Sequence, residues 1–246
     1  MKSSLIHLSL LLLLALPVRA DVLVAVASNF TAPAQAIAAA FEQQTGQRVR
    51  LAFGASGKLT AQIVQGAPFE IFLSADQAKP ELLVAQGQAV AASRFTYAMG
   101  KLVLWTVQDG VDPYQQLTQN YSARLALADP RLAPYGLAAQ QTLSALNLLE
   151  STRRQWVMGE NISQTWQFVA TGNAPLGLVA LSQVMENGQI MRGSGWVVPQ
   201  ALYQPIHQDA VLLKKGAQNP VALAFLQYLQ QPPAQAIMQR FGYGFE

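Results

Sequence analysis

From residue 21 onward, short apolar runs alternate with longer segments in which apolar residues recur every three or four positions. The runs are nearly continuous in apolar residues, which is typical of strands that are covered on both faces, as in parallel sheets. The pattern predicts strands at residues 22–27, 49–54, 71–75, 102–107, 125–128, 176–181 and 210–213.

The segments between the predicted strands carry the start and stop signals of helices. Pro33 opens the first helix, Ile37 and Phe41 lie on its apolar face, and Gly46 ends it. Strands that alternate with helices indicate an α/β fold. Because no stretch is rich in Pro, Gly or Ser, any division into lobes would be made by strands that cross directly between them. We expect further helices at residues 58–65, 136–148, 163–171, 220–230 and 233–241.

The first twenty residues differ from the rest of the chain. Lys2 precedes an apolar run at residues 8–16, and a small-residue ending follows at Ala20. This order is typical of a secretory signal peptide, and the run is too short to span a bilayer. We expect a signal peptide at residues 1–20, cleavage before Asp21, and an exported, soluble protein.

Composition excludes several classes of site. Without Lys2 and Arg19 the chain has 14 basic and 13 acidic residues, and no basic cluster, so a nucleic-acid partner is not expected. The absence of Cys excludes disulfides, thiolate metal sites and a diacylglycerol anchor. His207 is the only histidine after residue 20, which excludes zinc sites built from several histidines. We expect no enzyme activity, no cofactor and no directly ligated metal.

Polar or helix-opening residues stand at four junctions where a predicted helix begins. They are Ser28 with Asn29, Ser56, Tyr135 and Ile162. In open α/β sheets such junctions converge beyond the carboxyl ends of the strands, and helix starts offer unpaired N–H groups and partial positive charge. Together they could bind an anion through hydroxyl, amide and backbone donors. The alternative is that each is only a cap and a turn, since Ser and Asn are ordinary N-cap residues.

Six segments, taken in order and spacing, resemble those of the periplasmic molybdate-binding proteins of ABC transporters, and the similarity covers nearly all of the chain after residue 20. The segments are AVASNF at 25–30, FGASGKL at 53–59, GAPFEIFLSAD at 66–76, ADP at 128–130, PYG at 134–136 and GNAPLG at 172–177.

The resemblance implies a two-lobed type II periplasmic binding protein fold, in which each lobe is a mostly parallel sheet flanked by helices. Lobe I would comprise residues 21–98 and 207–246, and lobe II residues 99–206. The protein would be a monomer that captures molybdate, and tungstate as well, between the lobes and delivers it to an ABC transporter permease in the inner membrane.

Carried over by position, the resemblance places the ligand contacts on Ser28, Asn29, Ser56, Tyr135 and Ile162. One branch of the family has a donating tyrosine at the position of Ala180, so that donor is missing here. We expect Asn29 to replace it.

Two other functions remain open. A fully ionised tetrahedral oxyanion only accepts hydrogen bonds, so an all-donor site suits sulfate as well as molybdate, whereas phosphate retains a proton and favours a carboxylate acceptor. Asp129 and Glu160 would spoil this distinction if they pointed inward; we interpret them as first-turn or loop charges. A secreted serine hydrolase using Ser56 is the less favoured alternative, because its base would have to be His207 and no nucleophile-elbow motif surrounds Ser56.

Overall fold

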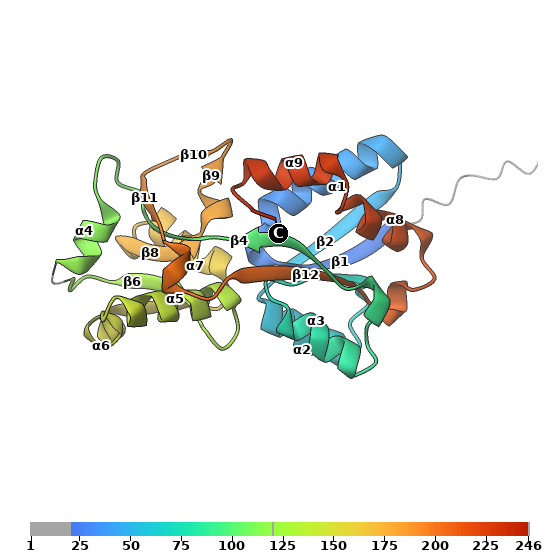
Figure 1. Cartoon of the computed structure of the whole chain (residues 1–246), viewed down its shortest axis with the longest axis horizontal. Helices are drawn as coiled ribbons and strands as arrows, with labels where there is room; N and C mark the ends of the chain where they lie inside the picture. The colour runs from blue at the N-terminus through green and yellow to red at the C-terminus, as the bar shows by residue number, and fades with distance from the viewer. Residues whose placement is uncertain (1–20, 120, 246) are drawn as a thin grey trace, which may run out of the picture.

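Two five-stranded sheets, one in each half of the molecule, form the framework of the protein (Figure 1). This computed structural model describes residues 21–119 and 121–245. The expected signal peptide, residues 1–20, lies outside the described residues. Within those residues no helix is long and apolar enough to cross a membrane.

The first half contains a sheet with the strand order β2-β1-β3-β12-β4. Strand β1 is parallel to β2 and β3, whereas β12 is antiparallel to both β3 and β4, so β12 alone runs against the other four strands. The bounds are β1 Asp21–Ala27, β2 Arg48–Gly54, β3 Ile71–Leu73, β4 Phe95–Gly100 and β12 Ile206–Leu212.

The second half contains a sheet with the order β11-β5-β8-β6-β7, in which β5 alone runs against the others. Its strands are β5 Leu102–Thr106, β6 Leu125–Ala128, β7 Trp156–Gly159, β8 Leu176–Ala180 and β11 Ser194–Val197. A separate hairpin pairs β9 Met185–Glu186 with β10 Gln189–Ile190. The expected α/β fold of two mostly parallel sheets is thereby confirmed.

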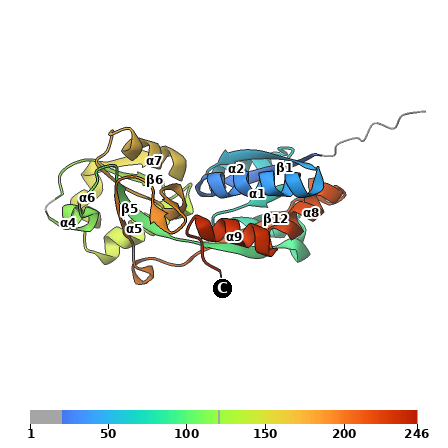
Figure 2. The same cartoon turned by 90° about the horizontal axis from the view of Figure 1, so that it is seen from above.

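Helices cover both faces of each sheet. In the first half α1, α8 and α9 lie on one face and α2 and α3 on the other, and α1 lies beside α9 (Figures 1 and 2). The α-helices are α1 Thr31–Thr45, α2 Ser56–Val64, α3 Ala78–Ala85, α4 Pro113–Thr118, α5 Pro134–Ala145, α6 Leu149–Thr152, α7 Ile162–Ala170, α8 Pro220–Tyr228 and α9 Pro232–Arg240. Short 3₁₀ helices are η1 Ser28–Phe30, η2 Ala91–Ser93, η3 Arg153–Gln155, η4 Leu181–Gln183, η5 Gln200–Leu202 and η6 Lys214–Gly216.

Side chains of successive strand residues enter separate cores on the two faces of a sheet. In β1, Val24 packs into the core beneath α1 and α8, whereas its neighbour Ala25 packs into the core beneath α2 and α3. In β5, Leu104 and Trp105 divide in the same way between two cores. Strands buried on both faces explain why the apolar runs in the sequence are continuous rather than alternating.

The sequence pattern located seven strands and six helices, with boundaries shifted by a few residues. The first helix begins at Thr31 rather than Pro33, and its expected end is confirmed at Gly46, whose φ of 71° is the left-handed conformation of a C-terminal cap. Strand β12 begins at Ile206 rather than residue 210, because its polar first half pairs with β4. The pattern missed β4 and β11, which mix polar and apolar residues, and the short strand β7. It also missed β9, β10, α3, α4 and α6.

The chain passes between the two sheets at two places. It moves directly from β4, which ends at Gly100, to β5, which begins at Leu102. It returns through residues 198–205, which connect β11 to β12. The parallel strands therefore direct their carboxyl ends, and the helix starts that follow them, toward the region where the halves meet.

Helix α5 begins in close contact with the end of β6. A Cβ atom added to Gly136 would lie 2.3 Å from the Ala128 carbonyl oxygen, and both sides of this contact are backbone. We expect Gly136→Ala to lower the free energy of unfolding by about 1–3 kcal/mol, the usual cost of overpacking. Urea unfolding would measure the change. In the control Gly244→Ala the nearest atom to the new Cβ is 3.9 Å away, and equal midpoints for the two variants would contradict the prediction.

Candidate functional site

All five sequence-predicted ligand residues line one cavity where the two halves meet. Ser28, Asn29 and Ser56 reach it from the first half, and Tyr135 and Ile162 from the second. Its volume is about 10 Å³, far below the 300–1,000 Å³ typical of pockets for organic ligands. The remaining lining residues are Ala27, Gly54, Ala55, Ala75, Ala133 and Pro134.

Each predicted residue lies in the first turn of a helix. Ser28 begins η1, Ser56 begins α2, Tyr135 is the second residue of α5, and Ile162 begins α7. The first amides of a helix have no acceptor within the helix, and its start carries a partial positive charge. Four helix starts at one cavity therefore create an environment that favours an anion.

Alanine N-caps leave these helix starts without side-chain acceptors. Ala27, Ala55 and Ala133 are the N-cap residues of η1, α2 and α5, and none makes a side-chain cap hydrogen bond. Elsewhere Asp112 caps α4 and Asn219 caps α8 through side-chain oxygens. Ser28 and Ser56 lie inside the first turn rather than at the N-cap, so the simpler interpretation of these serines as ordinary caps is wrong.

At α7 the cap is conventional. The side chain of Asn161 accepts a hydrogen bond from the Gln164 amide. This bond engages the amide of the third helix residue, Gln164, and not that of the first, Ile162. Ile162 is 2% exposed and lines the cavity.

The hydroxyl of Ser56 is oriented by the neighbouring strand end. Its Oγ accepts a hydrogen bond from the Ala75 amide at 3.1 Å, and the residue is 1% exposed. A serine hydroxyl has one proton and two lone pairs, so a bond accepted from Ala75 leaves its proton available to an acceptor. Ser56 is thus suited to donate into the cavity.

The side chain of Asn29 is engaged by the protein itself. Its Nδ2 lies 2.9 Å from Gln208 Oε1 and 2.9 Å from Tyr243 Oη, so both amide hydrogens have protein acceptors. To donate to a ligand in place of the donor missing at Ala180, this side chain would have to give up one of the two bonds. The backbone amide of Asn29, in the first turn of η1, could donate to a ligand without breaking either bond.

The phenol of Tyr135 points toward buried polar groups. Its Oη accepts a hydrogen bond from Gln208 Nε2 at 3.1 Å. Burial raises the pKa of Tyr135 well above 10 and that of Tyr243 to about 12, so both phenols are neutral at physiological pH. The polar group that Tyr135 offers to the cavity is therefore its backbone amide.

The residues that line the cavity carry no formal charge, and the two carboxylates that the sequence suggested near it have partners outside it. Asp129 accepts bonds from the amide and the guanidinium of Arg131, which hold the pKa of its carboxyl below the usual value. Glu160 forms an ion pair with Lys58 across the interface between the halves. Neither carboxylate belongs to the cavity lining, and within residues 21–119 and 121–245 no group of three His, Cys, Asp or Glu side chains could hold a metal.

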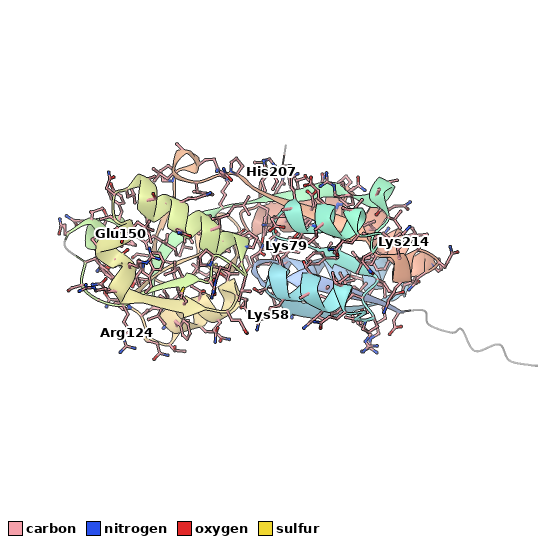
Figure 3. All side chains as sticks on the ribbon, turned by 90° about the horizontal axis from the view of Figure 1, so that it is seen from below. Lys58, Lys79, Arg124, Glu150, His207 and Lys214 are labelled. Carbon is pink, nitrogen blue, oxygen red and sulfur yellow. The ribbon has the colours of Figure 1, made fainter. Side chains whose placement is uncertain are left out.

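His207 and Ser56 do not share a cavity. His207 lies on β12 and lines a different, larger groove together with Lys79, Leu137 and Gln141. In Figure 3, His207 and Lys58 lie at opposite edges of the region where the halves meet. The Ser56 hydroxyl is oriented by Ala75, so the arrangement offers no support for a serine hydrolase.

Sequence reasoning missed three polar residues behind the cavity: Ser182, Gln208 and Tyr243. Gln208 is fully buried in β12, and its neighbour Asp209 is 1% exposed. The run of polar residues at 207–209, directly before the apolar segment at 210–213, was the available signal. Ser182 and Tyr243 carried none, because only the fold brings them to Asn29.

Comparison with known proteins gives consistent results over nearly the whole chain. Residues 22–244 match the profile of a family described as bacterial extracellular solute-binding protein. The molybdate-binding protein ModA of Azotobacter vinelandii is 52% identical over 92% of this chain and 91% of its own length. That of Rhodobacter capsulatus is 49% identical over 96% and 93%. A solved structure of an A. vinelandii periplasmic molybdate-binding protein has a TM-score of 0.88 at 39% identity, covering 92% of this chain and 99% of that one.

The Asp129–Arg131 contact predicts a pH dependence of stability. Because the folded-state pKa of Asp129 is depressed, its contribution is present above the unfolded carboxyl pKa of about 4 and is lost as pH falls through the folded value. We expect Asp129→Asn to lower the urea midpoint slightly at pH 7, and the difference from the parent to shrink toward pH 3. A difference that grew with acidification would contradict this assignment.

Proposed function

Because this chain belongs to the bacterial extracellular solute-binding proteins and is about half identical to two molybdate-binding relatives, we propose that it binds molybdate in the cavity between its halves. The observation that carries the proposal is the meeting of four helix starts, three of them capped by alanine, at a small cavity without formal charge. Such a site supplies donors only.

The donors are sufficient in number for a small dianion. Backbone amides from the first turns, together with the hydroxyls of Ser28 and Ser56, can supply five or more hydrogen bonds. A hydrogen bond to a charged acceptor contributes roughly 1.5–3 kcal/mol. After the cost of association, such a set is consistent with affinity in the micromolar range or tighter.

The chemistry of the cavity favours a fully ionised oxyanion. Molybdate, tungstate and sulfate have no proton to donate at neutral pH, whereas phosphate retains one and would need an acceptor. Asp129 is held by Arg131 and Glu160 by Lys58, so neither offers that acceptor. Tungstate fits the same donors, and sulfate differs from both mainly in size.

The ligand would bridge two lobes. We assign Ser28, Asn29 and Ser56 to lobe I, residues 21–98 and 207–246, and Tyr135 and Ile162 to lobe II, residues 99–206. An oxyanion held by donors from both lobes favours the closed form by its greater affinity for that form. The strands that cross near Gly100 and Ile206 would serve as the hinge.

The cellular role follows from this chemistry and from the signal peptide expected at residues 1–20. The protein would act as a monomer in the periplasm, without a cofactor or catalytic step, and would pass the ion to an ABC transporter permease in the inner membrane.

Calorimetric titration of the anion-free protein tests the ligand. We expect molybdate and tungstate to bind with a stoichiometry of one, and sulfate to bind at least tenfold more weakly because sulfate is the smaller ion and would lie farther from some of the fixed donors. If sulfate displaced molybdate at comparable concentration, the sulfate-binding alternative would replace the present proposal.

Removal of one donor tests the position of the site. We expect Ser56→Ala to weaken molybdate binding by roughly 1–3 kcal/mol, a 5- to 150-fold rise in Kd, through the loss of one hydroxyl. Ser151→Ala, which removes an exposed hydroxyl bonded to the Leu148 carbonyl, is the matched control. Equal affinities for the two variants would show that Ser56 does not contact the ion.

A further inference from the structure

Two serine hydroxyls reach across the interface to the backbone of the loop that carries Ser28 and Asn29. Ser163 Oγ, in α7, donates to the Ser28 carbonyl at 3.1 Å, and Ser182 Oγ, in η4, donates to the Asn29 carbonyl at 2.8 Å. Both serines belong to the second half and both acceptors to the first. Neither serine lines the cavity.

A buried polar network extends these contacts. Tyr243 Oη lies 3.0 Å from Ser182 Oγ and 3.1 Å from the Asn29 carbonyl oxygen. Gln208 Nε2 donates to Tyr135 Oη, which is the second place where the network crosses between the halves. Apart from Ser163, the network's side chains are buried, so it is shielded from competing water.

Gly100 leaves the space that the contact between Gln208 and Tyr135 occupies. A Cβ added to Gly100, at the end of β4, would lie 2.1 Å from Tyr135 Oη and 2.5 Å from Gln208 Nε2. The irregularity in β12 between Gln208 and Asp209 lies opposite Tyr97, farther along β4. The place where the chain crosses between halves is therefore shaped around the network rather than around the cavity.

These bonds can form only when the halves are together. Separation of the halves would leave the carbonyls of Ser28 and Asn29 to bond with water instead. The bonds that cross between the halves therefore add to the stability of the closed form without touching the ion.

We propose that Ser163 and Ser182 are positioning residues that fasten the closed form and set the residence time of the bound ion. We call the bonds from Ser163 Oγ to Ser28 O and from Ser182 Oγ to Asn29 O the serine clasp. By fixing the two carbonyls, the clasp also fixes the adjoining peptide groups, which carry amides of the η1 turn. The residence-time claim rests on the proposed binding of molybdate, whereas the claim about closure does not.

The clasp predicts a kinetic signature. Because it forms only after the halves meet, its loss should raise the dissociation rate and leave the association rate nearly unchanged. A buried hydroxyl–carbonyl bond corresponds to roughly a 2- to 10-fold change, so we expect Ser182→Ala, which loses its bonds to Asn29 and Tyr243, to release molybdate about tenfold faster. Ser163→Ala should have a smaller effect, and Ser163→Thr, which keeps the hydroxyl, should restore the parent rate.

Stopped-flow measurement of molybdate release is the first experiment. Tyr97→Phe is the matched control, because its buried hydroxyl belongs to the same network but contacts only Ser74 and Gln208, both in the first half. We expect this control to keep the parent dissociation rate. Equal dissociation rates for Ser182→Ala and Tyr97→Phe would overturn the residence-time claim.

The second experiment needs no ion. Since the chain has no Cys, dyes can be attached specifically at Leu82→Cys and Met158→Cys, two exposed positions in different halves. Without ligand, Ser182→Ala should shift the energy-transfer distribution toward the open form relative to Tyr97→Phe. An unchanged distribution would overturn the clasp as a closure device. A parent protein that failed to bind molybdate would overturn the proposed function, and this second measurement would still decide the clasp.

Discussion

The first-turn backbone amides of η1, α2, α5 and α7, which have no acceptor within their own helices, are the constraint on which the site depends. A buried helix start needs an acceptor, and alanine at three of the four N-cap positions ensures that the protein's own side chains do not supply one. Such helix starts occur in both halves, and all four lie at the same cavity. An anion that satisfies amides from both halves at once therefore links binding to the approach of the lobes.

A neutral site of this kind has a different basis for selectivity from a cationic one. Arginine or lysine would attract any anion, including phosphate. Fixed amides and hydroxyls accept only a ligand that presents oxygen lone pairs in matching directions and brings no proton of its own. The opposite charges of Lys58 and Glu160 cancel in their ion pair, which lies outside the cavity lining, so the pair adds little net charge near the ligand.

The sequence predicted the α/β fold because strands buried on both faces produce continuous apolar runs, and helices end at residues such as Gly46. It predicted the cavity residues because helix starts after parallel strands must converge. It could not predict the environment of Asn29, since Gln208 and Tyr243 reach that side chain from distant segments. Strand β4 was missed because its sequence, FTYAMG, lacks the continuous apolar run of a strand buried on both faces.

Strand β12 has a consequence for how the molecule is made. It lies between β3 and β4, although about a hundred residues of the other half separate it from β4 in the sequence. Until it is in place, β3 and β4 each present an open edge capable of pairing with another chain. The second half is continuous in sequence and has no such dependence. Synthesis therefore delivers a complete second sheet before the first can close, and a chain truncated before residue 206 would retain the unpaired edges that promote aggregation.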